Sequence, residues 1–492
     1  MTTPAAVSFA ATDIDAIAGL TGRIALLIGD PEKLDLAARR INRLTKGALT
    51  RLLESDAFKK LDEGAALDLS FPGGMAADVV QVVKLPRNAS GPDALAAGVA
   101  IGAGAGEKPV VIMAGSARGV RDIAQGAVLR AYDYADQRSG DRPAGAGAVS
   151  VMVSKPENCD GMAELIAARA AGVFFTRDLV NAPANVLTTT EFARQLSELS
   201  DLGVEVEVLE EADLEKLGMR TLLAVGQGSD SPSKVVVMQW KGGKQEAPFA
   251  LIGKGVVFDT GGISLKPAAG MEDMTMDMGG AGVVAGVMKT LATRKAQANV
   301  VALVGLVENM PDARATRPGD VVKSMKGDTV EVINTDAEGR MVLCDVMWYA
   351  QNRFAPTGMV DLATLTGAII IGLGHENAGV FSNDDALCNA FLKAARAEGE
   401  GAWRMPLGKA YAKQLKSRIA DVKNVGGRPA GSITAAEFLH RFVKDGTPWI
   451  HLDIAGVAST TADSTHAPKG ASGWGVLSLD RMIRDMFESD KE

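Results

Sequence analysis

The sequence has few of the residues on which disulfide frameworks and secretion depend. Its 492 residues include three cysteines, Cys159, Cys344 and Cys388, an odd and widely spaced set. That usage argues against a disulfide framework and favours a reducing, cytoplasmic compartment. The N-terminus lacks the basic region and apolar stretch of a signal peptide. An uncharged run of 13 residues, Leu362–Gly374, is too short to cross a bilayer, so we predict no membrane segment.

Histidine is scarce as well, and serine offers no catalytic elbow. The histidines are His375, His440, His451 and His466, and none is spaced as a zinc-binding pair on one helix face. No G-x-S-x-G sequence occurs. We therefore expect these histidines to be structural, and neither a histidine-based zinc site nor a serine nucleophile is favoured.

The charge balance is acidic. Lys and Arg total 52 against 60 Asp and Glu, which gives a net charge of −8 and no general attraction to nucleic acid or anionic lipid. Hydrophobic residues make up 47% and charged residues 23%, values that are typical of a globular protein.

Apolar runs alternate with helical patterns and predict an α/β fold in two parts. Ile24–Ile28 and Val149–Val153 in the first part, and Phe249–Gly253 and Val300–Val307 in the second, are typical of buried strands. A helix capped by Asp30, with Pro31 at its first position, is expected to continue to Leu52. We predict a smaller N-terminal domain at residues 1–155, a linker helix at 156–180 and a larger domain at 181–492.

Ionisable residues gather in two glycine-rich turns. One turn runs from Gly253 to Gly262 and continues to Asp277, and the other spans Asn334–Arg340. Both follow predicted strands, and loops at the carboxyl ends of strands form the ligand crevice of an open α/β sheet. Facing each other, the turns would combine four carboxylates and three cations: Asp259, Asp277, Asp336 and Glu338, with Lys254, Lys266 and Arg340.

Four crowded carboxylates repel one another, and two divalent cations would cancel their charge if a ligating lysine were neutral. Mn, Mg and Zn all accept carboxylate ligands, so ligand type leaves the metal open. Lys254 could bind a metal only as the unprotonated amine. At this point an alternative stays open, in which the acidic residues cap helices and the cations form surface pairs.

The two turns closely resemble the leucine aminopeptidase (cytosol aminopeptidase) family of two-metal exopeptidases. The resemblance is carried by the sequences GKGVVFDTGGISLKP and NTDAEGR, at Gly253–Pro267 and Asn334–Arg340. It extends through GMEDMTMDMGGA, ENMP, RPGD, ATLTGA, ITAAEFL and HLDIAG, and so covers most of Asn181–Gly456. It implies a catalytic C-terminal domain with a mixed central sheet flanked by helices, and a hexamer that acts on peptides with a free N-terminus.

The resemblance also implies residue roles. One metal would be held by Asp259, Asp336 and Glu338, and the other by Lys254, Asp259, Asp277 and Glu338. Bridging carboxylates place two metals roughly 3.5–4 Å apart, where both can share a water, so the nucleophile would be a bridging hydroxide. Lys266 would polarise the scissile carbonyl, and Arg340 would hold a bicarbonate that shuttles the proton.

Specificity follows from the same resemblance. A free α-amine can coordinate one metal while the carbonyl binds the other, so only the first residue is released. The substrate pocket would include Met274, Thr364 and Gly367, and the soft surface of Met274 would favour Leu or Met. Two residues depart from the family pattern: Thr189 stands where the family commonly has proline, and Met341 replaces the usual leucine. Neither is a proposed ligand, and we expect Thr189 to alter only a turn.

Two alternatives come from other classes of protein. Some bacterial relatives bind DNA, and a basic stretch of Arg39, Arg40, Arg43, Lys46 and Arg51 lies on the first predicted helix. A solvated helix face is the simpler explanation of that stretch. The other alternative, a silent scaffold, conflicts with the complete set of ligands. Cys344, after Arg340, is expected to be buried rather than reactive.

Overall fold

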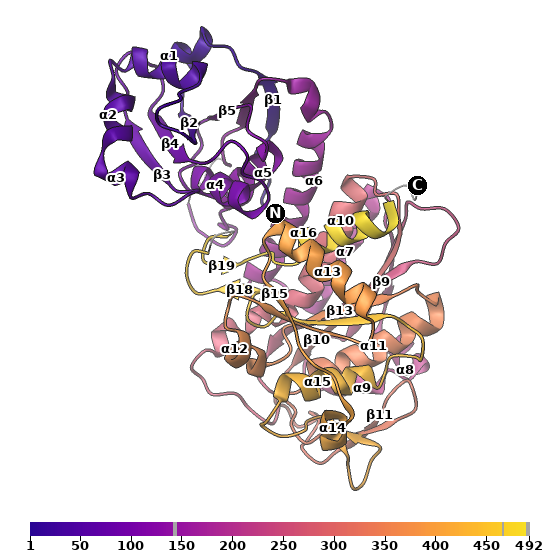
Figure 1. The fold of residues 1–492 in the computed structure, drawn as a ribbon. Helices are drawn as coiled ribbons and strands as arrows, with labels where there is room; N and C mark the ends of the chain where they lie inside the picture. Colours follow the sequence, from indigo (N-terminus) through magenta and orange to yellow (C-terminus); the bar gives the residue numbers. More distant parts are fainter. Residues whose placement is uncertain (141–144, 465–466, 489–492) are drawn as a thin grey trace. The chain divides into compact units, whose positions relative to one another are not determined.

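The computed structural model describes residues 1–140, 145–464 and 467–488, which form two compact units (Figure 1). One unit comprises Met1–Phe174, Ala397–Gly399 and Ala462–Pro468, and the other comprises the rest. The long helix α6 (Met162–Asn181) crosses the division between them in sequence. We keep as a proposal the domain limits predicted from the sequence, with the first domain ending at residue 155 and the second beginning at residue 181.

The first unit is built on one six-stranded sheet with the strand order β1-β6-β5-β2-β4-β3. Every pair in it is parallel except β3 with β4. Its strands are β1 (Val7–Ala11), β2 (Arg23–Ile28), β3 (Ala66–Ser70), β4 (Val79–Lys84), β5 (Val110–Gly115) and β6 (Val149–Val153). Its helices include α1 (Leu36–Leu44), α2 (Ala48–Glu54), α3 (Asp56–Lys59), α4 (Pro92–Ala103) and α5 (Val120–Arg130).

The helix expected after Asp30 begins later and is interrupted. The side chain of Asp35, not that of Asp30, accepts from the backbone of Ala38 and caps α1. Lys46 and Gly47 adopt left-handed conformations, with φ of 49° and 80°, so α1 and α2 are separate helices. The prediction of one continuous helix was wrong because the apolar spacing continues across this turn.

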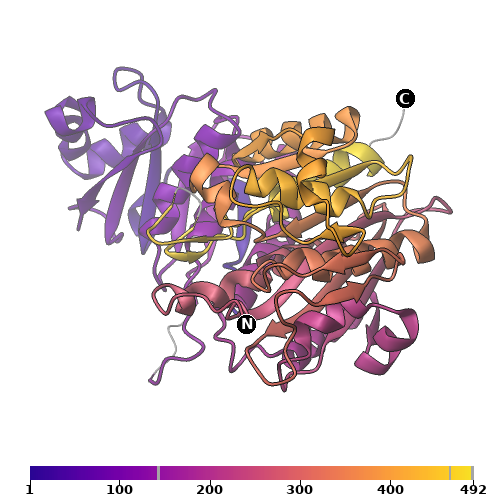
Figure 2. The same ribbon diagram turned by 90° about the horizontal axis from the view of Figure 1, so that it is seen from below.

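The second unit contains a mixed eight-stranded sheet with the order β15-β14-β17-β13-β9-β10-β8-β7. Its centre is parallel, and β14 with β17, β10 with β8 and β8 with β7 are antiparallel. The strands are β7 (Glu205–Leu209), β8 (Lys234–Lys241), β9 (Phe249–Asp259), β10 (Asn299–Asn309), β13 (Met359–Ala363), β14 (Ala378–Ser382), β15 (Ala402–Arg404) and β17 (Trp449–Asp453). Figure 2 shows helices on both sides of this sheet, which confirms the predicted α/β fold.

The remaining elements of this unit surround the large sheet. A small sheet joins β11 (Val321–Lys323), β12 (Thr329–Glu331) and β16 (Val422–Lys423), and β18 (Ser459–Thr460) pairs with β19 (Gly470–Ala471). The α-helices are α7 (Thr189–Ser197), α8 (Glu211–Leu217), α9 (Arg220–Gly226), α10 (Gly279–Thr293), α11 (Gly339–Phe354), α12 (Gly367–Leu373), α13 (Asp385–Glu398), α14 (Lys409–Ala412), α15 (Gly431–His440) and α16 (Val476–Ile483). Among the described residues, no helix combines the length and apolar character needed to cross a membrane.

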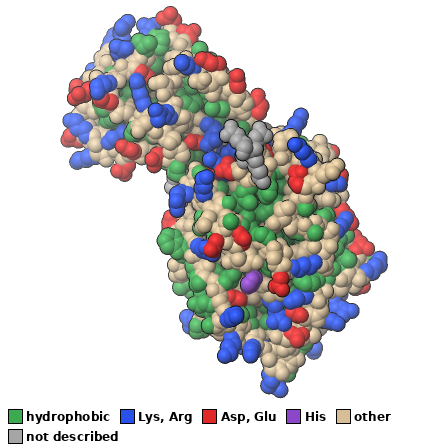
Figure 3. All heavy atoms as spheres, turned by 45° about the vertical axis from the view of Figure 1, so that its right-hand side comes forward, with side chains coloured by type: hydrophobic (Ala, Val, Ile, Leu, Met, Phe, Trp, Pro, Cys, Tyr) green, Lys and Arg blue, Asp and Glu red, His purple; other side chains and the backbone are tan. Residues whose placement is uncertain are grey.

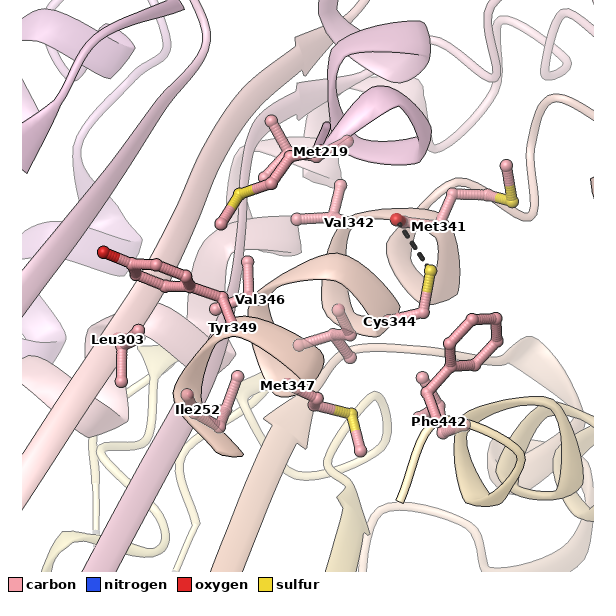
Figure 4. Packing of buried hydrophobic residues seen from close by; sticks show 14 of the residues in the cluster. Met219, Ile252, Leu303, Met341, Val342, Cys344, Val346, Met347, Tyr349 and Phe442 are labelled. Atoms are coloured by element: carbon pink, nitrogen blue, oxygen red, sulfur yellow. Dashed lines mark hydrogen bonds between the residues drawn. The ribbon is translucent and has the colours of Figure 1, made fainter. Parts of the chain in front are cut away.

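Helices α10 and α11 pack on opposite faces of β9. Ile252 belongs to the core cluster that α11 covers, whereas a Cβ at Gly253 would lie 2.6 Å from Cα of Ala281 on α10. Successive strand residues point to opposite faces, so Lys254 shares the side of Ile252. Figure 4 shows Cys344 of α11 inside this core, where its Sγ donates to the carbonyl of Met341 at 3.3 Å. Cys344 is fully buried, as expected.

The two departures from the family pattern fit this packing. Thr189 occupies the first position of α7, directly after the capping Thr188. Proline is favoured at that position because its missing N–H would have no partner there, and threonine keeps the helix. The change therefore lies at the first residue of a helix and not in a turn. Met341 is 2% exposed and packs in the α11 core.

Candidate metal centre

The ionisable side chains of the two glycine-rich segments come together near one edge of the large sheet. The prediction of a turn from Gly253 was wrong in part, because β9 continues through Lys254 to Asp259. Asp259 is the last residue of β9, and β10 runs parallel to β9 and ends beside it at Asn309. Asp277 lies on the 3₁₀ helix Met271–Met278, directly before α10. Asp336 and Glu338 lie in the turn that leads into α11. Strand ends and helix N-termini therefore converge at this edge.

Three of the predicted ligands form one cluster. Asp259, Asp336 and Glu338 each offer an oxygen within 4.8 Å of those of the other two. Lys254 Nζ lies 2.7 Å from Asp277 Oδ1 and 2.7 Å from Glu338 Oε1, which brings in the remaining two. The structure thus brings all five proposed ligands together.

Lys266 completes this arrangement of charges. Its Nζ lies 2.8 Å from Asp259 Oδ2 and also pairs with Asp336. The side chains of Lys266 and Asp336 are 20% and 32% exposed, whereas those of Lys254 and Glu338 are 2% and 4% exposed. The site therefore opens to solvent on the side of Lys266 and Asp336. Burial of the other charges rules out the alternative of ordinary surface pairs.

Burial and like charges perturb the carboxyl groups. Burial raises the pKa of Asp277 well above its usual value, against the opposing effect of Lys254. Burial and the neighbouring Asp259 raise the pKa of Glu338, and burial raises that of Asp336. Burial lowers the pKa of Lys254, but Asp277, Glu338 and Asp259 outweigh it, so the ammonium titrates above its ordinary range. Without a metal, Lys254 therefore stays protonated and pairs with Asp277 and Glu338, as Lys266 pairs with Asp259 and Asp336.

The donor set fits divalent metal ions. It consists of carboxylate oxygens with one amine, a combination that Mn and Zn accept. The Asp277 Oδ2 atom is buried and has no hydrogen-bond partner among the described residues. Buried polar atoms normally have partners, so an unpaired carboxylate oxygen in this cluster is suited to a cation.

Arg340 lies beside the cluster on the first turn of α11. Its Nη1 donates to the backbone oxygen of Asn424 at 2.7 Å. Its Nε is buried without a partner in the described part of the chain. Burial lowers the pKa of the guanidinium to about 10, against the effects of Glu338 and Asp453. Part of this planar group thus stays available for an anion.

Two of the three predicted pocket residues, Thr364 and Met274, lie near Asp277 in the structure. Thr364 Oγ1 donates to Asp277 Oδ1 at 2.8 Å, and its carbonyl accepts from Lys254 Nζ at 3.0 Å. Thr364 therefore also orients two proposed ligands, a contact that the sequence did not reveal. Met274 is half-buried on the 3₁₀ helix of Asp277, and Gly367 begins α12 with nothing within 4 Å of a Cβ placed on it.

Comparisons with known proteins identify the family of this chain. Residues 174–479 match the family described as "Cytosol aminopeptidase family, catalytic domain", which is more than half of the chain. The chain belongs to the cytosol aminopeptidase family. It is therefore a metal-dependent aminopeptidase, a peptidase of the hydrolase class.

Relatives of this aminopeptidase match it over nearly its whole length. It is 64% identical to a probable cytosol aminopeptidase of Dinoroseobacter shibae and 62% identical to one of Cereibacter sphaeroides, over 99% of this chain and 100% of each relative. Among solved structures, it resembles the bottromycin maturation enzyme BotP in complex with Mn, with a TM-score of 0.83, 33% identity and coverage of 94% of this chain and 99% of that one. A tomato leucine aminopeptidase mutant matches with a TM-score of 0.85, 30% identity and coverage of 98% and 97%.

The histidines of the aminopeptidase have other roles. His451 is fully buried and its Nδ1 lies 2.6 Å from Asp361 Oδ1 inside the sheet. His440 stacks on Trp449, and His375 Nδ1 lies 2.7 Å from the carbonyl of Gly456. Among the described residues, none of these belongs to the carboxylate cluster, and His466 lies outside the described residues.

Neutral residues of the site were missed by the sequence analysis. Thr335 Oγ1 donates to the carbonyl of Gly261 at 2.6 Å and accepts from the backbone of Ser264 at 2.8 Å, which ties the two ligand-bearing turns together. Asn424 is fully buried and hydrogen-bonds the backbone of Ile333 and Asn334. Asn309 contacts Asp259. Thr335 and Asn309 lie inside the family-like sequences NTDAEGR and ENMP, and this was the one feature of the sequence that could have pointed to them.

Gly339 supports Lys254 by leaving it room. A Cβ at Gly339 would lie 2.7 Å from both Cδ and Cε of Lys254, a side chain held at Nζ by two carboxylates. We expect Gly339→Ala to lower the free energy of unfolding by about 1–3 kcal/mol, as overpacked cores do, and to weaken metal binding. Urea unfolding and a metal titration measure both effects.

The matched control is Gly372→Ala in α12, where nothing lies within 4 Å of an added Cβ. Alanine in a helix is favoured over glycine by about 1 kcal/mol, so this variant should be at least as stable as the wild type. If Gly339→Ala bound metal as tightly as the wild type, the contact between a Cβ at residue 339 and Lys254 would not affect metal binding.

Proposed function

We propose that this aminopeptidase releases single N-terminal residues, preferably Leu or other apolar residues, from peptides with a free α-amine. The observation that carries the proposal is the buried cluster of carboxylates around Lys254, open to solvent beside Lys266 and Asp336. Asp259, Asp336 and Glu338 would hold one divalent ion, and Lys254, Asp259, Asp277 and Glu338 would hold the second. Mn is supported by the complex of BotP, and Zn suits the same donors.

When bound, the two ions would supply Lewis acidity and lower the pKa of a water, which would then be the nucleophile that the family resemblance implies. The chain supplies the positioning. Thr364 fixes Asp277, and Asn309 fixes Asp259, so both carboxylates are oriented before metal arrives. A substrate reaches them from the open side, because the opposite side is closed by the core.

Lys266 stands where the scissile carbonyl would enter. It is the more exposed of the two lysines, and its ammonium can donate to the carbonyl oxygen and stabilise the negative charge that develops on it. Burial lowers the pKa of Lys266, but Asp259, Glu338 and Asp336 outweigh it and raise the pKa above its ordinary value, so without metal the ammonium stays protonated at neutral pH. We assign it the role of electrophilic catalyst.

Arg340 fits the bicarbonate that we propose as the proton shuttle. The unpartnered, buried Nε and a planar set of donors match two oxygens of a carbonate-like anion. Backbone contact with Asn424 holds the guanidinium in place while Nε stays available. We further propose that the peptide's first side chain lies between Met274, Thr364 and the open space beside Gly367, which suits an apolar residue.

The cellular location and the oligomeric state are proposed from the relatives and from the family resemblance. Their names describe them as cytosol aminopeptidases, which supports a cytoplasmic location, and we propose a homohexamer from the family resemblance. DNA binding by the first unit stays an untested alternative. On the face drawn in Figure 3, basic and acidic side chains are mixed, which gives that alternative little support. A salt-dependent gel shift at physiological ionic strength would support it.

Removal of metal tests the proposed function. We expect chelation to abolish hydrolysis of a leucine amide dye and added Mn or Zn to restore it, because both the nucleophile and the carbonyl need the ions. The N-acetylated dye is the matched control and should never be cleaved, since its nitrogen is a poor ligand. Full activity after exhaustive chelation, or equal cleavage of the blocked substrate, would contradict the proposal.

Metal affinity should rise with pH. The pKa values of Asp277, Asp336 and Glu338 are raised without metal, so protons compete with the ions at higher pH than for ordinary carboxyls. Lys254, whose pKa is also raised, must lose its proton to become a ligand. Each proton released adds roughly a tenfold gain in affinity per pH unit. Calorimetric Mn titrations in buffers of different ionisation enthalpy measure this release, and pH-independent binding would contradict it.

A further inference from the structure

Asn309, the last residue of β10, contacts the metal centre although it has no ligand role. Its side chain is 4% exposed. Nδ2 donates to Asp259 Oδ1 at 2.7 Å and to the carbonyl of Thr335 at 3.1 Å. One neutral amide therefore joins a proposed bridging ligand to the turn that carries two other ligands, Asp336 and Glu338.

The contact with Asp259 determines how that carboxylate is presented. Asp259 Oδ1 accepts from Asn309 and also from the backbone N–H of Gly261 at 2.8 Å. With Oδ1 held in this way, Oδ2 is turned toward Lys266, on the open side of the cluster. Partners of this kind fix ligand orientation in metal sites, and their loss typically weakens metal binding.

The neutral amide suits this position electrostatically. A carboxylate here would add a charge to an already repulsive cluster, and an ammonium would compete with the metals for Asp259. An amide donates two hydrogen bonds without changing the net charge. Asn309 thus orients Asp259 without disturbing the balance between the carboxylates and the ions.

The backbone around Asn309 is arranged for these contacts. The register between β9 and β10 shifts after Val307, so that Asn309 pairs with Asp259. The carbonyl of Asn309 accepts from the N–H of Thr260 at 3.0 Å and from its Oγ1 at 2.8 Å. Gly262 has φ of +63°, and a Cβ there would lie 2.7 Å from Asn309 Oδ1. Irregular pairing at strand ends often re-aims side chains at functional sites.

We propose that Asn309 is a positioning residue of the metal centre. It orients Asp259 and ties the turn of Thr335, which carries Asp336 and Glu338, to that carboxylate. The inference rests on the proposed metal site, and it adds a specific dependence of metal affinity on an amide that does not itself bind metal.

The test compares Mn affinity across three variants of the full chain, measured by calorimetry and by competition with a chelator. We expect Asn309→Ala to bind Mn about 10- to 100-fold more weakly. Asn309→Asp has nearly the same shape but cannot donate when ionised, so it should also bind more weakly. At saturating Mn, the KM for the leucine amide dye should change much less than the Mn affinity.

Asn299→Ala is the matched control, because Asn299 lies at the other end of the same strand. Its side chain bonds the backbone of a surface loop, with Gly243, Lys244 and Glu246 as partners. Ten residues of strand place it roughly 33 Å from Asn309. Its loss should lower the melting temperature without changing Mn affinity, which separates a stability effect from a positioning effect.

Unchanged Mn affinity in Asn309→Ala, or an equal loss in Asn299→Ala, would overturn the inference. Failure of both Asn309 variants to fold would also overturn it, because Asn309 would then serve the fold rather than the metals. A wild-type chain that bound no Mn would instead refute the proposed metal site, an outcome distinct from both.

Discussion

Glu338→Ala should lower kcat/KM for a leucine amide dye by roughly 10³-fold or more and release bound metal. The side chain of Glu338 is 4% exposed, contacts Lys254 and belongs to the three-carboxylate cluster. As the proposed bridge between two ions, it supports both at once. A metal contributes several kcal/mol of transition-state stabilisation, and each 1.36 kcal/mol is about tenfold in rate. Steady-state kinetics and elemental analysis of the purified variant measure the two effects.

Glu331→Ala is the matched control for this variant. Glu331 lies on β12, only a few residues earlier in the chain, and its side chain bonds Ser417 rather than the cluster. We expect it to keep wild-type activity and metal content. If Glu338→Ala kept both as well, Glu338 would not be a ligand and the bridging assignment would be wrong.

Lys266→Met should lower kcat by about 10²- to 10³-fold while metal content stays that of the wild type. This is the range seen when one preorganised donor to a developing oxyanion is removed. Methionine keeps the length of the side chain and removes the charge. Because the lysine acts on charge that develops during reaction, KM should change much less than kcat.

The control for Lys266 is Lys241→Met, which breaks an exposed ion pair with Glu205. Exposed pairs contribute little to stability, so this variant should match the wild type in both rate and metal content. Loss of metal from Lys266→Met would show that the lysine holds the ligands in place rather than acting on the carbonyl. An unchanged kcat would remove it from the mechanism.

Much of the site could be predicted because its chemistry follows from charged residues at strand ends. Asp259 closes β9, and Glu338 directly precedes α11, as the alternation of apolar runs and glycine-rich turns indicated. Crowded carboxylates repel one another, so two acidic turns that face each other favour a metal site, although the strand before the second turn, β12, lies in the small sheet rather than beside β9. The family-like motifs then supplied the individual roles.

What the sequence did not reveal depends on tertiary contacts. Asn309 and Asn424 are neutral, lie far from Asp336 in the chain and act through single hydrogen bonds that no periodicity signals. The hydroxyl of Thr364 meets Asp277 only because their loops converge. The break between α1 and α2 at Gly47 was missed for a different reason, since left-handed residues there do not interrupt the apolar spacing.

The most direct test of the metal centre is anomalous diffraction from crystals of the full chain loaded with Mn. We expect two peaks per subunit, one contacted by Asp259, Asp336 and Glu338 and the other by Lys254, Asp259, Asp277 and Glu338. A single peak, or peaks away from these side chains in an active enzyme, would contradict the central claim that this buried cluster holds the two catalytic ions.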